Sequence, residues 1–145
     1  MKRVFAVLDT NVLVASLLSK NSTSATVRIM EALKHRAFIS VYNNEIIDEY
    51  SEVLSRAKFA FDKDLIENII NAVQDNGIPA DRKSTDIKFD DEEDIVFYEV
   101  ALSKEGAYVV TGNKRHFPDN PIVVTPAEMI KILEDFGLIE NNNIN

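Results

Sequence analysis

Acidic side chains stand at three separate places where the sequence predicts the end of a strand or the start of a helix. Asp9 directly follows an apolar run, Glu45 and Glu49 open a helical pattern, and Asp94 opens another. If these carboxylates meet, each pair repels by about 1 kcal/mol at about 4 Å in water, and by more in a less polar medium. A fold that gathers them therefore requires a cation.

The absence of His and Cys from this acidic set indicates which cation would fit. Ligands that are all oxygen atoms suit Mg²⁺ or Mn²⁺ rather than zinc. Ions of this kind activate water and offset negative charge on a leaving oxygen, so they serve phosphoryl transfer. The acids therefore favour a phosphoryl-transfer site.

Each of these residues also has an ordinary interpretation. An Asp at the end of a strand is often a helix cap, and Glu49 and Glu52 can be solvated side chains of a polar helix face. The acidic run at 90–94 can be a helix start that the helix dipole favours. His116 can be a surface histidine. The joint pattern, with one acid at each of three element ends, favours a metal site over these alternatives.

Short apolar runs predict strands that are buried on both faces, at residues 4–8, 38–41, 108–110 and 122–124. Helical periodicity fills the intervals, most clearly at 46–54 and 65–73. The motif Thr-Pro-Ala-Glu at Thr125 predicts the start of a last helix through a capping box, and Gly137 predicts its end.

Strands that alternate with helices predict an α/β fold with a parallel sheet covered on both faces. Binding sites in such sheets form beyond the carboxyl ends of the strands, which is where the acids are expected to lie. The polar stretch 75–94 is interpreted as a connection within one domain.

Length and composition limit the class of protein. A chain of 145 residues is expected to form one domain. Its formal charge of −8, from 24 acidic and 16 basic residues, argues against a passive nucleic-acid binder. Cysteine is absent, which excludes disulfides and thiolate metal sites. No signal peptide and no spanning run of about 18–20 apolar residues is recognised, so we expect a cytoplasmic protein without membrane contact.

The chain contains, in this order, the blocks VLDTNVLVASLL, EIIDEYSEVLSRAKF, DEEDIVFYEVAL and AYVVTGNKRHFP. Together they resemble the PIN-domain family of small metal-dependent nucleases, in particular its bacterial and archaeal branch of VapC-like toxin components. The resemblance runs from residue 4 to about residue 136. It implies a three-layer α/β/α sandwich with a central parallel sheet of four to five strands. We expect a single PIN-like domain over residues 1–139 and a flexible tail over 140–145.

The resemblance also implies a ligand set. It assigns Asp9, Glu45 and Asp94 as metal ligands for Mg²⁺ or Mn²⁺. The family often has a fourth acid in the motif T-G-D, whereas this sequence has T-G-N with Asn113. An amide offers an oxygen without charge, so a second ion is expected to bind poorly.

Further residues are assigned supporting roles in the same way. Thr10 and Asn11 are expected to orient the site by hydrogen bonds. Gly112 brings backbone close to it, and the Thr111 hydroxyl positions water or substrate. Glu49 is the expected accessory acid.

The reaction implied is that of an endoribonuclease, which hydrolyses an RNA phosphodiester without a covalent enzyme intermediate. Lys114, Arg115 and His116 are expected to bind the substrate, which would let an acidic protein hold RNA locally. A loop selected for solubility is the alternative for these three residues. A small antitoxin protein and a second copy of the chain are the expected partners.

Two other functions remain open at this point. A PIN fold weakened by loss of the fourth acid would bind RNA or a protein without efficient cleavage. A haloacid-dehalogenase-like phosphatase also ends its first strand with Asp, but that family requires D-x-D, and Asn11 occupies the second position here.

Overall fold

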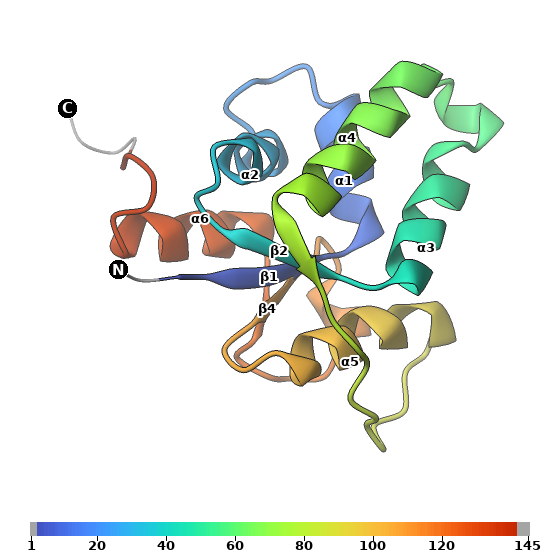
Figure 1. Ribbon diagram of the computed structural model, residues 1–145, viewed down its shortest axis with the longest axis vertical. Helices are drawn as coiled ribbons and strands as arrows, with labels where there is room; N and C mark the ends of the chain where they lie inside the picture. The colour runs from blue at the N-terminus through green and yellow to red at the C-terminus, as the bar shows by residue number, and fades with distance from the viewer. Residues whose placement is uncertain (1–2, 142–145) are drawn as a thin grey trace.

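The computed structural model describes residues 3–141, which form a five-stranded parallel sheet in the order β3-β2-β1-β4-β5 (Figure 1). The strands are β1 Phe5–Leu8, β2 Ile39–Tyr42, β3 Gly77–Pro79, β4 Tyr108–Val110 and β5 Val123–Val124. The predicted parallel sheet of four to five strands is confirmed, and its first strand lies in the middle. Of the predicted tail over 140–145, residues 142–145 lie outside the described residues.

The helices lie where the periodicity predicts them. They are α1 Thr10–Leu18, α2 Ala25–Lys34, α3 Asn44–Leu54, α4 Lys63–Asp75, α5 Ile95–Ser103 and α6 Pro126–Asp135, with the 3₁₀ turns η1 Ala57–Phe59, η2 Glu92–Asp94 and η3 Lys114–His116. The predicted capping box of α6 is confirmed, because Thr125 accepts a hydrogen bond from the Glu128 amide and Glu128 accepts one from the Thr125 amide. No helix among the described residues is long and apolar enough to cross a membrane.

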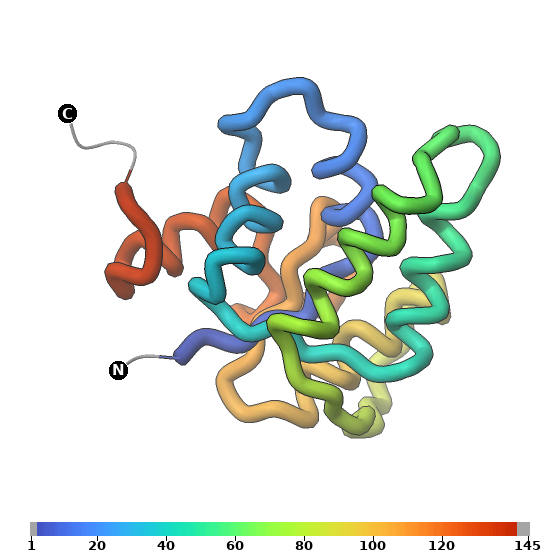
Figure 2. Tube along the Cα trace, turned by 45° about the horizontal axis from the view of Figure 1, so that its top comes forward, coloured from blue at the N-terminus to red at the C-terminus, as the bar shows by residue number. Residues whose placement is uncertain are grey.

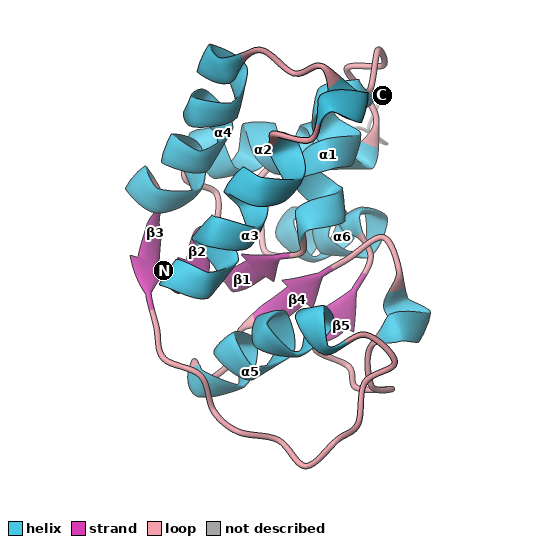
Figure 3. Ribbon diagram, turned by 90° about the vertical axis from the view of Figure 1, so that its right-hand side faces the viewer, coloured by secondary structure: helices cyan, strands magenta, loops and turns pink. Residues whose placement is uncertain are grey.

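The direction of the crossovers explains the layers. Connections between parallel strands are almost always right-handed. The chain moves from β1 through β2 to β3 and then returns past β1 to β4, so the crossover helices fall on opposite faces. Figure 3 shows α5 below the sheet, and α1 to α4 and α6 above it. The predicted three-layer α/β/α sandwich is therefore confirmed.

The upper layer consists of two groups of neighbouring helices. α1 packs against α2, which in turn contacts α6, and α3 packs against α4. Figure 2 shows α3 and α4 as a hairpin whose turn, at η1, projects away from the sheet. This arrangement holds the start of α3 near the carboxyl end of the sheet.

The core is densest around β1. Ala6, Val7 and Leu8 are almost completely buried between the layers. The hydroxyl of Tyr50, also buried, donates a hydrogen bond to the carbonyl of Leu8 and so fastens α3 to the end of the strand. Burial of a large apolar side chain contributes about 1.5–3 kcal/mol, so β1 is a stable base for the residue that follows it.

Strand β3 is the main difference from the sequence-based prediction, which interpreted 75–94 as a connection. Gly77 and Pro79 are weak strand residues, and Pro is tolerated in a sheet only at an edge. The pairing with β2 holds the strand, since the Ala80 amide donates to the Tyr42 carbonyl over 2.8 Å. A side chain at Gly77 would lie within 2.6 Å of the Ser40 carbonyl oxygen, so only glycine fits there.

Candidate active site

The strand order places a topological switch point between β1 and β4, and we call the space beyond the carboxyl ends of these two strands the crevice. The chain leaves β1 toward β2 on one side and comes back to β4 on the other, and ligands bind at such a switch point beyond the carboxyl ends of the strands. Asp9 follows β1 directly and Thr111 follows β4. The Asp9 amide donates to the Val110 carbonyl over 2.9 Å, so the two strand ends are held side by side.

Asp9 is fixed in place by the loop after β4. Its Oδ2 accepts a hydrogen bond from the Thr111 hydroxyl over 2.8 Å, and that hydroxyl accepts one from the Asn113 amide over 3.0 Å. Asp9 is only 6% exposed, and this burial raises the pKa of its carboxyl although the Thr111 bond opposes the change. The structure therefore keeps an acid in a place that disfavours its charge.

The two residues after Asp9 differ in what they contact. The side-chain oxygen of Asn11 accepts a hydrogen bond from the Gly112 amide over 3.1 Å, which joins α1 to the loop after β4. The hydroxyl of Thr10 is buried and has no hydrogen-bond partner among residues 3–141. Asn11 thus supports the loop, while Thr10 presents a buried polar atom beside Asp9.

Asp94 enters the site from the other face of the sheet, at the start of α5. Burial, together with the charges of Asp9 and Asp91, raises the pKa of Asp94 to about 6. The imidazole of His116, which is charged only when protonated, lies close by, with Nδ1 3.9 Å from Asp94 Oδ2. The repulsion between Asp94 and Asp9 indicates that the two carboxylates are close enough to act on each other.

Helix α3 contributes Glu49, which is half-buried. Burial raises the pKa of Glu49, and the charges of Glu93 and Glu52 raise it further. Glu49 in turn is one of the charges that raise the pKa of Asp9. The side chain expected to be an accessory acid is therefore in the electrostatic environment of the strand-end acid.

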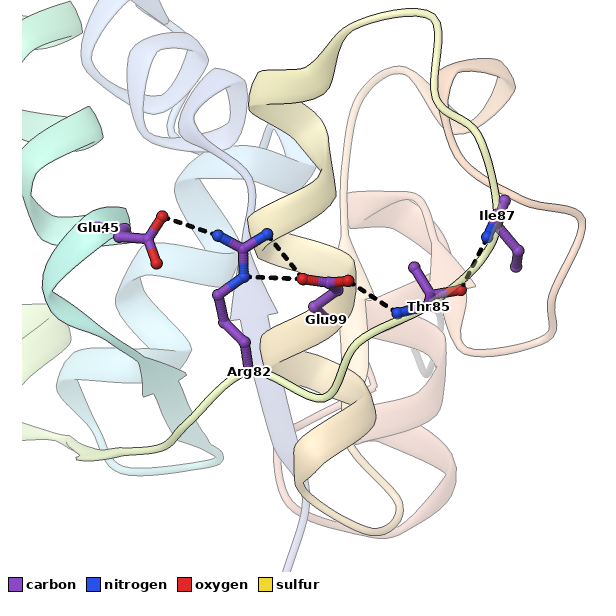
Figure 4. A network of polar contacts seen from close by, with 5 residues as sticks. All are labelled: Glu45, Arg82, Thr85, Ile87 and Glu99. Atoms are coloured by element: carbon purple, nitrogen blue, oxygen red, sulfur yellow. Dashed lines mark hydrogen bonds and ion pairs between the residues drawn. The ribbon is translucent and has the colours of Figure 1, made fainter.

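Glu45 points to a different partner. Its Oε2 lies 2.8 Å from Nη1 of Arg82, which also contacts Glu99 in α5 (Figure 4). The structure thus does not join Glu45 to Asp9 and Asp94 in the way the family resemblance implies. Glu99 was the signal that sequence reasoning missed: a carboxylate within the apolar run IVFYEVAL predicts a buried acid, and a buried acid requires a cationic partner.

The acids fit a divalent cation by their chemistry, although they are not clustered tightly. No group of three or more His, Cys, Asp or Glu side chains within residues 3–141 is close enough to hold a metal ion as placed. Asp9, Glu49 and Asp94 nevertheless all have raised pKa values, and in the described part of the chain none forms a salt bridge with Lys or Arg. Oxygen donors with uncompensated charge are what Mg²⁺ and Mn²⁺ bind.

The basic residues form η3, and of these His116 lies against Asp94. Lys114, Arg115 and His116 are exposed, and the ammonium of Lys114 lies 3.0 Å from a Glu128 carboxylate oxygen. Lys114 and Arg115 also line a pocket of about 590 Å³ beside β5. The side chain of Asn113 is exposed at the rim of a smaller pocket that Asn11 and Gly112 share. The turn η3 thus brings three basic side chains into the segment after β4, with Lys114 paired to Glu128.

Comparisons with known proteins agree with this architecture. A family model described as PIN domain matches residues 5–115, a region that runs from β1 to η3 and includes Asp9, Glu49 and Asp94. No significant match was found among curated proteins or among solved structures. The matched region covers most of the chain and all of the acidic crevice, so this protein belongs to the PIN domain family.

Proposed function

We propose that this protein is a metal-dependent endoribonuclease that hydrolyses RNA phosphodiester bonds. PIN domains are nuclease-type folds in general, and the observation that supports activity here is the set of uncompensated acids at the switch point. Asp9, Glu49 and Asp94 come from separate elements, yet the charge of Asp9 is coupled to each of the other two. An acidic crevice of this kind suits a divalent cation and the phosphate that the cation would hold.

We assign Glu49, rather than Glu45, as the third metal-binding acid. The charge of Glu45 is already neutralised by Arg82 over 2.8 Å. Glu49 lies one helical turn further along the same face of α3 and forms no salt bridge within residues 3–141. Because the chain has Asn113 in place of a fourth acid, that position would contribute only a neutral oxygen.

The residues around the proposed metal site have different roles. Thr111 and the backbone of β4 hold Asp9 at a fixed position, while Glu49 and Asp94 are half-buried side chains that a cation would draw toward Asp9. When bound, Mg²⁺ or Mn²⁺ lowers the pKa of a water ligand and offsets charge on the phosphate. Thr10 would then present its buried hydroxyl to the occupied site.

Lys114 and Arg115 are the proposed contacts to the RNA backbone. Both are exposed in η3 and directly precede His116, which lies 3.9 Å from Asp94. Each phosphate that they neutralise should add roughly 0.7 to the slope of log K against log salt concentration for a single strand. Local positive charge of this kind would allow binding despite a net charge of −8.

A biological role as the cytoplasmic toxin of a toxin–antitoxin pair, bound by a small antitoxin and forming a homodimer, is our further proposal. It is supported by the order of the four sequence blocks. Light scattering tests the dimer, and a species of only 16.4 kDa at micromolar concentration would contradict it.

A second candidate, RNA binding without efficient cleavage, is favoured by two observations. Asn113 removes one charge, and the acids are not preassembled among the described residues. RNA that is retained by the protein but stays intact in the presence of Mn²⁺ would support this function instead.

The test of the enzymatic proposal is cleavage of single-stranded RNA in Mn²⁺, compared between the wild-type protein and Asp9→Asn. We expect cleavage by the wild type, loss of cleavage on chelation, and at least about a hundredfold loss in the variant, as for removal of a group that stabilises charge in the transition state. Equal cleavage by both proteins would indicate a contaminating nuclease and contradict the proposal.

A further inference from the structure

Arg82 forms a bridge between two helices of the candidate site (Figure 4). Its Nη1 lies 2.8 Å from Glu45 Oε2 in α3, while its Nε and Nη2 lie 2.8 and 2.7 Å from Glu99 Oε1 in α5. We call Arg82, Glu45 and Glu99 the Arg82 bridge. One planar guanidinium thus joins a helix of the upper layer to the helix on the opposite face of the sheet.

The α5 side of the bridge is firmly built. The Glu99 side chain is only 9% exposed, and its second oxygen accepts a hydrogen bond from the Thr85 amide over 2.8 Å. The Glu99 carbonyl accepts another from the Lys83 amide over 3.0 Å. Figure 4 shows the segment from Arg82 to Ile87 running along α5, so Arg82 is held against this helix before it reaches across to α3.

The two helices that the bridge joins are those that bring Glu49 and Asp94 to the crevice. Glu49 follows Glu45 by one turn of α3, and Asp94 caps the helix that contains Glu99. The rings of Tyr50 and Phe97, 6.4 Å apart between centroids, form an apolar contact between the same helices. The spacing of α3 and α5 therefore sets how far apart these two acids stand.

We propose that Arg82 is a positioning residue of the active site, which clamps α3 to α5 so that rotation of the side chains, without movement of the helices, brings Glu49 and Asp94 onto one cation with Asp9. This inference rests on the proposed metal-dependent function. Like charges on the two helices favour their separation, and the two ion pairs of Arg82 oppose it. Arginine suits this task because its fork can bind two carboxylates at once, which a lysine ammonium does less well.

The first test is Mn²⁺ affinity measured by calorimetry on Arg82→Gln. We expect the Kd to rise by about tenfold, as for loss of an outer partner of a metal site, with partial recovery in Arg82→Lys. The matched control is Arg28→Gln, which breaks a similar pair between α2 and α6, where Arg28 lies 3.3 Å from a well-buried Glu134. We expect the control to change Kd by no more than about twofold, and an equal effect in both variants would overturn the proposal.

A double-mutant comparison separates a bridge residue from a metal ligand at position 45. If Glu45 acts only through Arg82, adding Glu45→Gln to Arg82→Gln weakens Mn²⁺ binding no further, because the pair is already broken. If Glu45 binds the ion itself, the second substitution weakens binding again. That result would overturn the bridge as the role of Glu45.

A distance measurement tests the coupling of the helices without any metal. The chain has no cysteine, so Asp48→Cys in α3 and Ser103→Cys in α5, both exposed positions, can be spin-labelled alone. We expect a broader distribution of distances in Arg82→Gln than with native Arg82, and an unchanged distribution would overturn the inference. If the native protein binds no Mn²⁺, the proposed function fails by itself, and the distance measurement still decides whether Arg82 holds the helices.

Discussion

Two acids of α3, Glu45 and Glu49, differ in their partners, and so do Asp94 and Glu99 at the start and in the middle of α5. Glu45 and Glu99 share Arg82 as an ion-pair partner, whereas Glu49 and Asp94 interact with the charge of Asp9 and form no salt bridge with Lys or Arg within residues 3–141. The two sets are close in the sequence, since Glu49 lies one turn beyond Glu45 and Asp94 lies just before the turn that leads to Glu99. The partner of an acid, rather than its position in a motif, therefore separates a structural pair from a candidate ligand.

Burial alone does not separate the sets either. The side chain of Glu99 is 9% exposed and that of Asp94 is 17% exposed, so the bridge acid is the more buried of the two. Asp94 lies 3.9 Å from the imidazole of His116, which is charged only when protonated, whereas Glu99 lies 2.7 Å from the guanidinium of Arg82. A carboxylate left without a close cation in such a place is a stronger indication of an ion site than a buried one that is paired.

The largest effect that we predict is loss of cleavage on removing an unpaired acid. Asp94→Asn should reduce RNA cleavage in Mn²⁺ by at least about a hundredfold, because it removes charge that holds the ion. The rate of cleavage of a labelled single strand measures this effect, and circular dichroism shows whether the fold is kept. Full activity in a folded Asp94→Asn protein would remove the distinction between the two sets of acids.

The neighbouring pair in α3 provides the sharpest comparison. Glu49→Gln should weaken Mn²⁺ binding by about a hundredfold, because it removes a proposed ligand. Glu45→Gln should weaken it by no more than about tenfold, the lower end of the range for loss of an outer partner. Both are exposed-to-half-buried positions on one helix, so the substitutions are matched. The reverse order of the two Kd values would show that Glu45 is the ligand, as the family resemblance implied.

Loss of the paired acid Glu99 should affect the stability of the fold. Glu99→Gln breaks a buried ion pair and should lower the free energy of unfolding by about 2 kcal/mol, the range for a hydrogen bond to a charged group. Chemical denaturation in a buffer with chelator measures this change. A protein as stable as the wild type would mean that the Arg82 bridge contributes little to the fold.

The last predicted effect is a pH dependence of stability in chelator. The pKa of Asp94 is raised in the folded protein from the ordinary 3.8 to about 6, so the folded state binds more protons between these values. The contribution of Asp94 to stability is therefore present below about pH 4 and is lost as the pH rises through about 6. Relative to Asp94→Asn, the wild-type melting temperature should fall across this window, and a constant difference would contradict the shift.

The fold was largely predictable because each main element has a strong local signal. Continuous apolar runs identify β1 and β4, and the Thr125 capping box identifies the start of α6. Strand β3 has no such signal, since Gly77 and Pro79 disfavour strands and the pairing partner is 37 residues earlier in the chain, at Ser40 for Gly77. Long-range pairing decided its structure.

The candidate site was predictable in part for the same reason. The rule that sites form beyond the carboxyl ends of strands locates Asp9 and the loop after β4 without any knowledge of side chains. It does not distinguish Glu45 from Glu49, which lie on one face of one helix. Arg82 makes that distinction, and it reaches α3 only because β3 and the segment after it fold against α5.

The most direct test of the central claim is a calorimetric titration of Mn²⁺ into the wild-type protein and into Asp9→Asn. We predict saturable binding of about one ion per chain in the wild type, and none in the variant, because Asp9 is the acid that both Glu49 and Asp94 face. Absence of saturable binding in the wild type, or equal binding in a folded Asp9→Asn protein, would contradict a metal site at the end of β1.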